Sequence, residues 1–262
     1  MSRKLIFTID VDRDVNFAIP GVSGAGSIDR GAGIAPRFTS SERGLKLLCE
    51  LLDEVGVIGT FFIEGRTAEI IDCSPVSDSC IGLHGYDHED LTGETTGLTY
   101  TREDVQGILD RGFAAVESNV GRPRCFRAPY MTATNDILSI VQSMGIGCDS
   151  SSYYRMSDVG VVDEPIPGMV RYPVPKTKDM NGKTMAAYLW PMHEGRRRPS
   201  DYVWMASTVR DGPLVLATHS WHIVESREDG MMSEDRVEEN LNNVRKILEG
   251  ILDQGFTSVP MQ

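Results

Sequence analysis

Short apolar runs alternate along the chain with longer stretches in which apolar residues recur at helical spacing. Residues 4–10 are almost continuously apolar, as expected of a buried strand, whereas residues 41–55 place their apolar side chains on one face of a helix that Gly56 ends. This alternation is typical of a parallel α/β sheet or barrel. The other predicted strands are 57–63, 80–83, 124–126, 146–148, 213–217 and 256–259, and the other predicted helices are 101–120 and 233–254. Thr101, with Asp104 three residues on, nearly matches a capping box for the helix over 101–120.

Two regions rich in glycine or proline interrupt this pattern. Residues 17–38 contain five glycines and residues 165–199 contain six prolines. Both are predicted to be long loops, which often shape a binding site but can equally lie away from any ligand. No repeat, low-complexity segment or linker divides the 262 residues, so residues 1–262 are expected to form a single catalytic domain.

Composition and charge narrow the possible partners. The formal net charge is −12, which disfavours nucleic acid and anionic lipid as ligands, and no stretch is apolar for long enough to cross a membrane. The apolar run at residues 5–9 meets Asp10 too early for a secretory signal, so the expected location is cytoplasmic.

Cysteine usage agrees with that location. The number of cysteines is odd and their spacing matches no zinc motif, and although Cys73 and Cys80 could close a small loop, free thiols are expected. The five are Cys49, Cys73, Cys80, Cys125 and Cys148.

The first candidates for chemistry are Asp10 and Asp12, at the end of the first predicted strand. Residues two apart in a strand point to the same side. Two carboxylates held so close are costly unless a cation or an arginine lies between them. One of them could therefore bind a metal while the other accepts a proton, although this motif alone is equally consistent with a solvated strand end.

His84 and His88 form the second candidate, directly after the predicted strand 80–83. Histidines four residues apart can bind one ion from a shared helix face or from a tight loop. With one aspartate they complete a set of two histidines and one carboxylate, which leaves positions open for water and substrate. A lone His-x-x-x-His is common by chance, but this one follows a strand, where barrel active sites form.

Further predicted strands also end in side chains of catalytic type. Arg127 can hold a carboxylate, and Pro129 stiffens a turn from which the amide of Tyr130 could point at a ligand. His219 has the pKa range of a general acid near neutral pH. Asp149 can hold a histidine in one tautomer or can merely cap the next segment. The simpler interpretation of the Arg127 motif is a surface loop with a structural proline, and the simpler interpretation of His219 is a hydrogen-bonded loop histidine.

The order of these motifs resembles that of the NodB-homology polysaccharide deacetylases, carbohydrate esterase family 4. Thr-x-Asp-x-Asp, His-x-x-x-His, Arg-x-Pro-Tyr, Asp-Ser-Ser and Leu-x-x-His follow one another from residue 5 to about residue 222, and residues 59–65 are similar to the family's Ala-Thr-Phe-Phe-x-x-Gly strand. The resemblance implies an irregular (β/α) barrel of about seven parallel strands. It also implies metal-dependent hydrolysis of an N-acetyl group on an amino-sugar substrate, with release of acetate.

The resemblance implies a metal site and its ligands. Asp12, His84 and His88 match the metal-binding residues of the family. Zinc is the expected ion, and cobalt, nickel, manganese and iron suit the same ligands.

The resemblance also implies catalytic roles. Asp10 matches the general base that activates water, and Arg127 is expected to pair with it. The backbone amide of Tyr130 is expected to help hold the oxyanion. His219 matches the acid that protonates the leaving amine, and Asp149 matches an acid that tunes the base or the histidine.

The chain departs from the common family pattern in ways that leave alternatives open. Val11 separates the two aspartates, a variant that resembles the subgroup containing cytoplasmic-type peptidoglycan deacetylase-like proteins and allantoinase-like amidases. A small non-sugar amide, with a cyclic or formyl group, is therefore the second interpretation of the substrate. His222 lies close enough to compete with His219 for the acid role, and His193 could touch substrate from the region 165–199.

Two interpretations from other classes are weaker. A non-catalytic carbohydrate-binding barrel would be expected to lack a ligand or the base, and a two-histidine, one-carboxylate iron oxygenase would leave Asp10, Arg127 and His219 without a role. The expected partner is an acylated amino sugar or oligosaccharide, and the pattern says nothing about oligomeric state. Three tryptophans are equally suited to sugar stacking and to the core: Trp190, Trp204 and Trp221.

Overall fold

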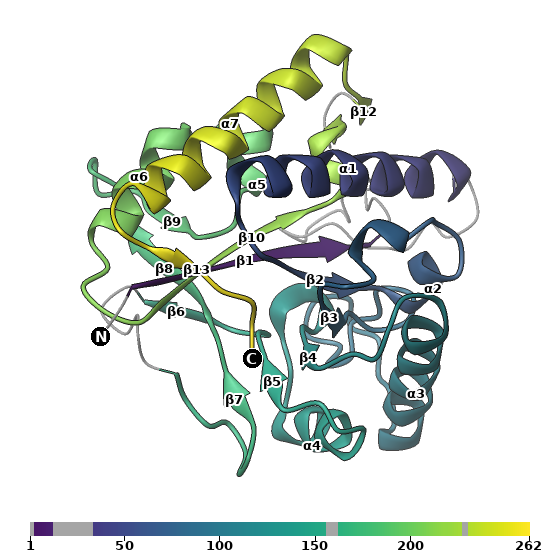
Figure 1. The fold of residues 1–262 in the computed structure, drawn as a ribbon. Helices are drawn as coiled ribbons and strands as arrows, with labels where there is room; N and C mark the ends of the chain where they lie inside the picture. The colour runs from purple at the N-terminus through teal and green to yellow at the C-terminus, as the bar shows by residue number, and fades with distance from the viewer. Residues whose placement is uncertain (1–2, 13–33, 156–161, 227–229) are drawn as a thin grey trace.

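A parallel sheet forms the centre of the computed structural model, which describes residues 3–12, 34–155, 162–226 and 230–262 (Figure 1). Its strands, in spatial order, are β10 (Pro213–His219), β1 (Lys4–Val11), β2 (Gly59–Ile63), β3 (Cys80–Leu83), β4 (Cys125–Phe126), β5 (Cys148–Asp149) and β7 (Val170–Arg171). A further strand, β13 (Thr257–Ser258), pairs with the start of β1. All these pairs are parallel, and the sheet curls into a partial barrel, which confirms the predicted fold class.

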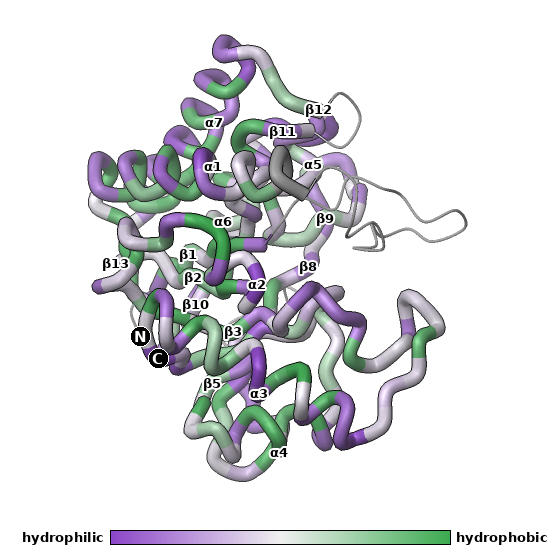
Figure 2. The backbone as a smooth tube through the Cα atoms, turned by 90° about the vertical axis from the view of Figure 1, so that its right-hand side faces the viewer, coloured by the Kyte–Doolittle hydropathy of each residue, from purple (hydrophilic) through white to green (hydrophobic). Residues whose placement is uncertain are grey.

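Helices cover the outside of the sheet. In Figure 1, α1 (Ile34–Val55) and α7 (Glu234–Leu252) lie together above the strands, whereas α3 (Arg102–Asn119) and α4 (Asn135–Ser143) lie at the opposite end of the sheet. These helices alternate between hydrophilic and hydrophobic positions along the backbone (Figure 2). Every residue of β1 after Lys4 is buried, which explains its continuous apolar sequence.

The predicted helix over 101–120 is present as α3 with its capping box. The Thr101 hydroxyl accepts a hydrogen bond from the Asp104 amide at 3.1 Å, and the Asp104 carboxylate accepts one from the Thr101 amide at 2.8 Å. The other predicted helices and strands are also present, most with slightly shifted ends.

The predicted start of the helix over 41–55 is wrong. Helix α1 begins at Ile34, inside the region 17–38 that was expected to be a loop. Pro36 stands in its first turn, where a missing N–H costs no hydrogen bond, so the proline does not prevent the helix. Residues 17–33 of the predicted loop lie outside the described residues.

The predicted loop over 165–199 is wrong in part, because short strands and helices interrupt it. The strands β8 (Val174–Lys178) and β9 (Thr184–Ala186) form a second, three-stranded sheet with β6 (Tyr153–Arg155), and β7 joins the main sheet. Prolines suit this arrangement because Pro191 and Pro199 lie in the first turns of α5 (Trp190–His193) and α6 (Pro199–Ser207).

Short elements complete the described structure. They are α2 (Gly65–Ala68), the 3-10 helices η1 (Ser74–Val76), η2 (Pro129–Met131) and η4 (Trp221–Ile223), and the antiparallel pair β11 (Glu225–Ser226) and β12 (Gly230–Met231). The five cysteines are free thiols, as expected. Over the described ranges, no helix combines the length and apolar character that a membrane span requires.

Candidate active site

The carboxyl ends of the parallel strands bring the separate sequence motifs together. The backbone pairing continues one residue past β3 and β4, because the His84 amide donates to the Ile63 carbonyl and the Arg127 amide donates to the Leu83 carbonyl, each at 3.0 Å. Asp10 and His219 are register partners on β1 and β10. Residues far apart in the chain therefore meet at one edge of the sheet.

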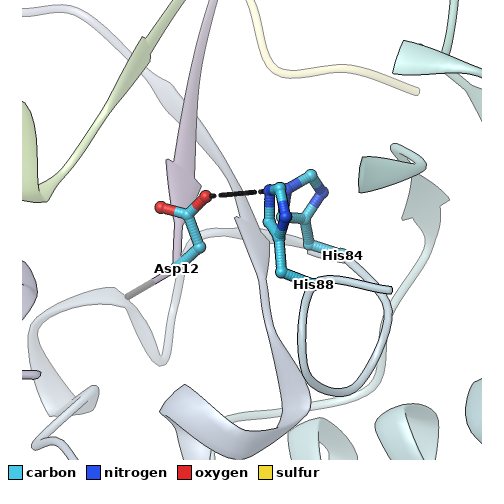
Figure 3. A group of neighbouring side chains, drawn as sticks. All are labelled: Asp12, His84 and His88. Atoms are coloured by element: carbon cyan, nitrogen blue, oxygen red, sulfur yellow. Dashed lines mark ion pairs between the residues drawn. The ribbon is translucent and has the colours of Figure 1, made fainter. Parts of the chain in front are cut away.

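Asp12, His84 and His88 form a compact, buried triad (Figure 3). The Oδ2 atom of Asp12 lies 3.8 Å from Nε2 of His84 and 3.5 Å from Nε2 of His88. One ligand atom from each residue falls within 4.8 Å of the others, which is the spacing that a single bound ion requires. All three residues are at most 6 % exposed, so an ion here would be held in a largely dry environment.

The hydrogen bonding of His84 suits a metal ligand. Its Nδ1 atom lies 2.8 Å from the backbone oxygen of Arg127, and because a carbonyl only accepts, Nδ1 carries the hydrogen. The Nε2 atom then keeps its lone pair, and it is buried with no hydrogen-bond partner in the described part of the chain. Burial also lowers the pKa of His84, which favours the neutral form that binds metals.

A tight loop presents the two histidines, one of the two geometries that the sequence allowed. Gly85 and His88 have positive φ angles of 70° and 55°, which turn the chain sharply. The Gly65 amide at the start of α2 donates to the Gly85 carbonyl at 3.1 Å. The Glu89 carboxylate accepts the Tyr86 amide at 3.1 Å, so the loop is fixed from both sides.

Asp10 is an ionised carboxylate with donors on both oxygens. Arg127, which is fully buried, donates from Nη1 to Oδ1 at 2.7 Å, so the predicted pair is present. The hydroxyl of Tyr188 donates to Oδ2. Burial acts to raise the pKa of Asp10, but Arg127, His84, His219 and the Tyr188 hydrogen bond outweigh it and lower the pKa to about 2.

His219 stands beside Asp10 and faces the triad. Its Nε2 atom lies 3.9 Å from Oδ2 of Asp12 and 3.1 Å from the Tyr188 hydroxyl. The rings of Trp190 and Trp221 lie with centroids 5.1 and 5.4 Å from the imidazole centroid. Burial is the main cause that lowers the pKa of His219, to about 3, so the ring is neutral at rest.

Tyr188 is a site residue that the sequence did not reveal. It belongs to the region predicted as a loop, and no motif marks it. The segment around it pairs with β10, because the Leu189 amide donates to the Ala217 carbonyl at 2.7 Å. The Tyr202 hydroxyl donates to the Tyr188 carbonyl at 3.0 Å, so the backbone of this segment is held firmly. Only the apolar character of residues 187–190 hinted that this stretch is buried.

The remaining predicted residues occupy different surroundings. Tyr130 has a positive φ of 61° and its ring lies edge-on to His88, with centroids 4.9 Å apart. Asp149 accepts from Nε of Arg171 at 2.7 Å and from the Ser151 amide at 3.0 Å. The capping alternative for Asp149 is therefore present, and no hydrogen bond joins it to a histidine among the described residues.

The two other histidines of this region form a buried pair, with ring centroids 4.9 Å apart. His222 pairs through Nε2 with Glu194 at 2.7 Å, and its ring stacks on Trp221. His193 lies 2.9 Å from the Thr218 hydroxyl and is 2 % exposed. His219, rather than His222, is the histidine beside Asp10. Trp221 is fully buried and belongs to the core, whereas Trp190 and Trp204 are partly exposed.

Part of the chain matches a known protein family. The model of the polysaccharide deacetylase family matches residues 40–148, which include both histidines of the triad. The chain is 31 % identical over 157 residues to a peptidoglycan deacetylase-like protein of Gibberella zeae, covering 56 % of this chain and 43 % of that protein. It is 31 % identical over 110 residues to a chitooligosaccharide deacetylase of Azorhizobium caulinodans, covering 38 % of this chain and 47 % of that protein. The chain thus spans less than half the length of both relatives.

The fold itself also has a solved counterpart. A protein from Mycobacterium smegmatis, provisionally described as a polysaccharide deacetylase, matches with a TM-score of 0.61 and 22 % identity. The match covers 100 % of this chain and 94 % of that protein, so the whole described barrel follows the same architecture.

Proposed function

This chain belongs to the polysaccharide deacetylase family, and on that premise we propose that it is a divalent-metal-dependent hydrolase that removes the acetyl group from an N-acetylated amino sugar. The observation that carries the proposal is the convergence of the Asp12, His84 and His88 ligand atoms beside Asp10 and His219. Three protein ligands leave positions open for water and substrate, as in catalytic rather than structural sites.

The donor set fits a divalent ion, with zinc as the expected one. When bound, the ion would lower the pKa of a water molecule and polarise the amide carbonyl. Asp12, His84 and His88 would hold it through one carboxylate oxygen and two imidazole nitrogens.

The chain's own residues account for the proton transfers. Asp10 is ionised, and its oxygens keep lone pairs beyond those that Arg127 and Tyr188 occupy, so it can take a proton from the attacking water. His219, next to Asp10, can deliver a proton to the leaving nitrogen as the C–N bond breaks. Asp10 thus gains a proton from water and His219 gives one to the amine, and transfer of a proton from Asp10 to His219 returns both groups to their starting states. The Tyr130 amide is assigned to the oxyanion of the carbonyl.

Acetate release is the direct test. Zinc-loaded protein is incubated with N-acetylated sugars, from free and nucleotide-linked monomers to chitin oligomers and peptidoglycan fragments, and acetate is quantified. We expect release by the wild type and none by His84→Ala or by a chelated sample. His193→Gln, which removes a buried histidine outside the triad, serves as the control. Absence of acetate from every sugar while zinc remains bound would refute the proposal.

One observation favours a second candidate, hydrolysis of a small non-sugar amide. The region 165–199 places Tyr188 and Trp190 directly against Asp10 and His219, which suits a compact substrate more than an extended chain. The same assay with formyl and cyclic-ureide substrates distinguishes the two candidates.

A further inference from the structure

We propose that Tyr188 is a positioning residue whose hydroxyl fixes the carboxylate of Asp10 and makes Nε2 the protonated ring nitrogen of His219. The Tyr188 hydroxyl lies within hydrogen-bond distance of Oδ2 of Asp10 and of Nε2 of His219, the latter at 3.1 Å. Its consequence for catalysis rests on the proposed function, whereas the protonated nitrogen of His219 can be measured without it.

Counting hydrogens assigns the direction of both bonds. A tyrosine hydroxyl has one hydrogen to donate. Arg127 holds Asp10 as an ionised carboxylate, which only accepts, so the Tyr188 hydrogen lies on Oδ2 of Asp10. Toward His219 the tyrosine oxygen can then only accept, and Nε2 of His219 must supply the hydrogen.

The other nitrogen of the ring agrees with this assignment. Nδ1 of His219 is buried and has no hydrogen-bond partner among the described residues. A buried N–H without an acceptor is more costly than a buried bare lone pair on a ring that packs against aromatic side chains. The Nδ1 environment therefore also favours placing the hydrogen on Nε2.

The position of Nε2 links the tautomer of His219 to catalysis. Nε2 is the atom that faces the triad, 3.9 Å from Oδ2 of Asp12. His219 therefore presents an N–H toward the reacting groups whether the ring is neutral or protonated. His84 is held in the opposite tautomer by the Arg127 carbonyl, which leaves its Nε2 bare for the metal. One backbone acceptor, at His84, and one side-chain acceptor, at His219, thus give the two histidines opposite roles.

The support of Tyr188 shows that its place is built into the fold. The residue is 8 % exposed, its neighbours pair with Ala217 of β10, and Tyr202 bonds its carbonyl. The ring of Tyr188 lies with its centroid 5.0 Å from that of His219. The hydroxyl therefore cannot leave its two partners without disturbing the edge of the barrel.

The test uses nitrogen-15 resonances of the histidine rings in metal-free protein at mildly alkaline pH, with the signals of His219 identified by their loss in His219→Gln. We expect a protonated Nε2 and a bare Nδ1 in the wild type, and a mixture of tautomers in Tyr188→Phe. Tyr172→Phe, which removes a hydroxyl bonded to the backbone oxygen of Gln262, should leave the His219 signals unchanged. A bare Nε2 in the wild type, or an unchanged tautomer in Tyr188→Phe, would overturn the proposal.

Kinetics on the zinc-loaded enzyme then measure the consequence. Tyr188→Phe should lower kcat by about 10- to 100-fold with KM and zinc affinity nearly unchanged, because one proton-transfer pair is misaligned while binding is intact. An equal rise in KM with kcat unchanged would show that Tyr188 binds substrate instead. Failure of the wild type to release acetate would count against the proposed function and would leave the tautomer measurement standing.

Discussion

Arg127 carries a positive charge into a part of the molecule that water does not reach. Its guanidinium donates to Asp10 and, through Nη2, to the Ser150 hydroxyl at 2.9 Å, and its plane lies over the Phe62 ring. A buried ion pair adds little net stability as a whole, but loss of one partner strands the other charge. The pair therefore preserves the ionised state of Asp10 more than it stabilises the fold.

Removal of either partner should consequently be costly, and removal of both less so. We expect Arg127→Met to lower the free energy of unfolding by about 3–5 kcal/mol, and Asp10→Asn in the same chain to recover part of that loss. Urea unfolding of the metal-free proteins measures all four members of this cycle. If the losses of unfolding free energy in the two single variants add up to the loss in the double variant, the two charges do not interact.

His193 gives a pH dependence whose sign follows from its burial. Burial, and then the neighbouring His222, lower the pKa of His193 well below the ordinary 6.5. As the pH falls below about 6.5, the unfolded chain takes up a proton that the folded chain does not, so stability is complete above that pH and declines below it.

The variant His193→Gln should therefore lose stability less steeply than the wild type as the pH falls from 8 toward 4, by at most about 1.4 kcal/mol per pH unit for one site. Urea midpoints across this range provide the measurement, and the difference at the alkaline end serves as the baseline. Parallel curves for the two proteins would contradict the assignment of a neutral, buried His193.

At the scale of elements, helix α3 packs directly on the loop that carries His84 and His88, the proposed metal ligands. Gly112 of α3 lies so close to this loop that an added Cβ would meet the Gly85 carbonyl oxygen at 2.5 Å. Gly65 at the start of α2 is similarly close to Gly112. These glycines let the backbones approach and so set the position of His84 and His88.

Alanine substitutions in α3 separate this packing from helix propensity. Gly112→Ala should cost about 1–3 kcal/mol through overpacking and weaken zinc affinity. Gly107→Ala, in the same helix with open space around it, should instead stabilise by about 0.5–1 kcal/mol. Thermal unfolding and zinc titration of both variants measure this. Equal changes in unfolding temperature and zinc affinity for the two variants would show that α3 does not position the loop.

At the scale of the whole molecule, the proposed metal site joins the end of β1 to the loop after β3, so metal binding should stabilise the fold. A ligand at 100 times its Kd adds about 2.7 kcal/mol, or roughly 5–10 °C in Tm for a domain of this size. We expect this rise with zinc in the wild type and in His193→Gln, and its loss with a chelator. A similar rise in His84→Ala would mean that zinc binds elsewhere.

The partial barrel has an open edge at β10, next to the candidate site. The sheet begins at β10 and ends at β7, and these two strands do not pair with each other. The segment that holds Tyr188 pairs with β10 instead and covers that edge. A segment that seals the barrel thus also contributes a side chain to the site, since the edge of β10 lies beside His219.

The sequence by itself determined the fold class and most of the site. Buried parallel strands must be apolar throughout, and their carboxyl ends converge, so Asp10, Asp12, His84, Arg127 and His219 could be assigned to one edge from local pattern and motif order. The start of α1 and the second sheet were not predictable in the same way, because glycine and proline signal turns even where tertiary contacts impose regular structure.

Only the tertiary structure decided the partners of individual polar groups. Asp149 bonds to Arg171 rather than to a histidine, His222 bonds to Glu194, and Tyr188 enters the site from a region with no motif. Each of these contacts joins residues at least 20 positions apart, and a hydrogen bond depends on position within a fraction of an ångström. Such precision comes from the packing of the whole barrel, and no local pattern of residue types records it.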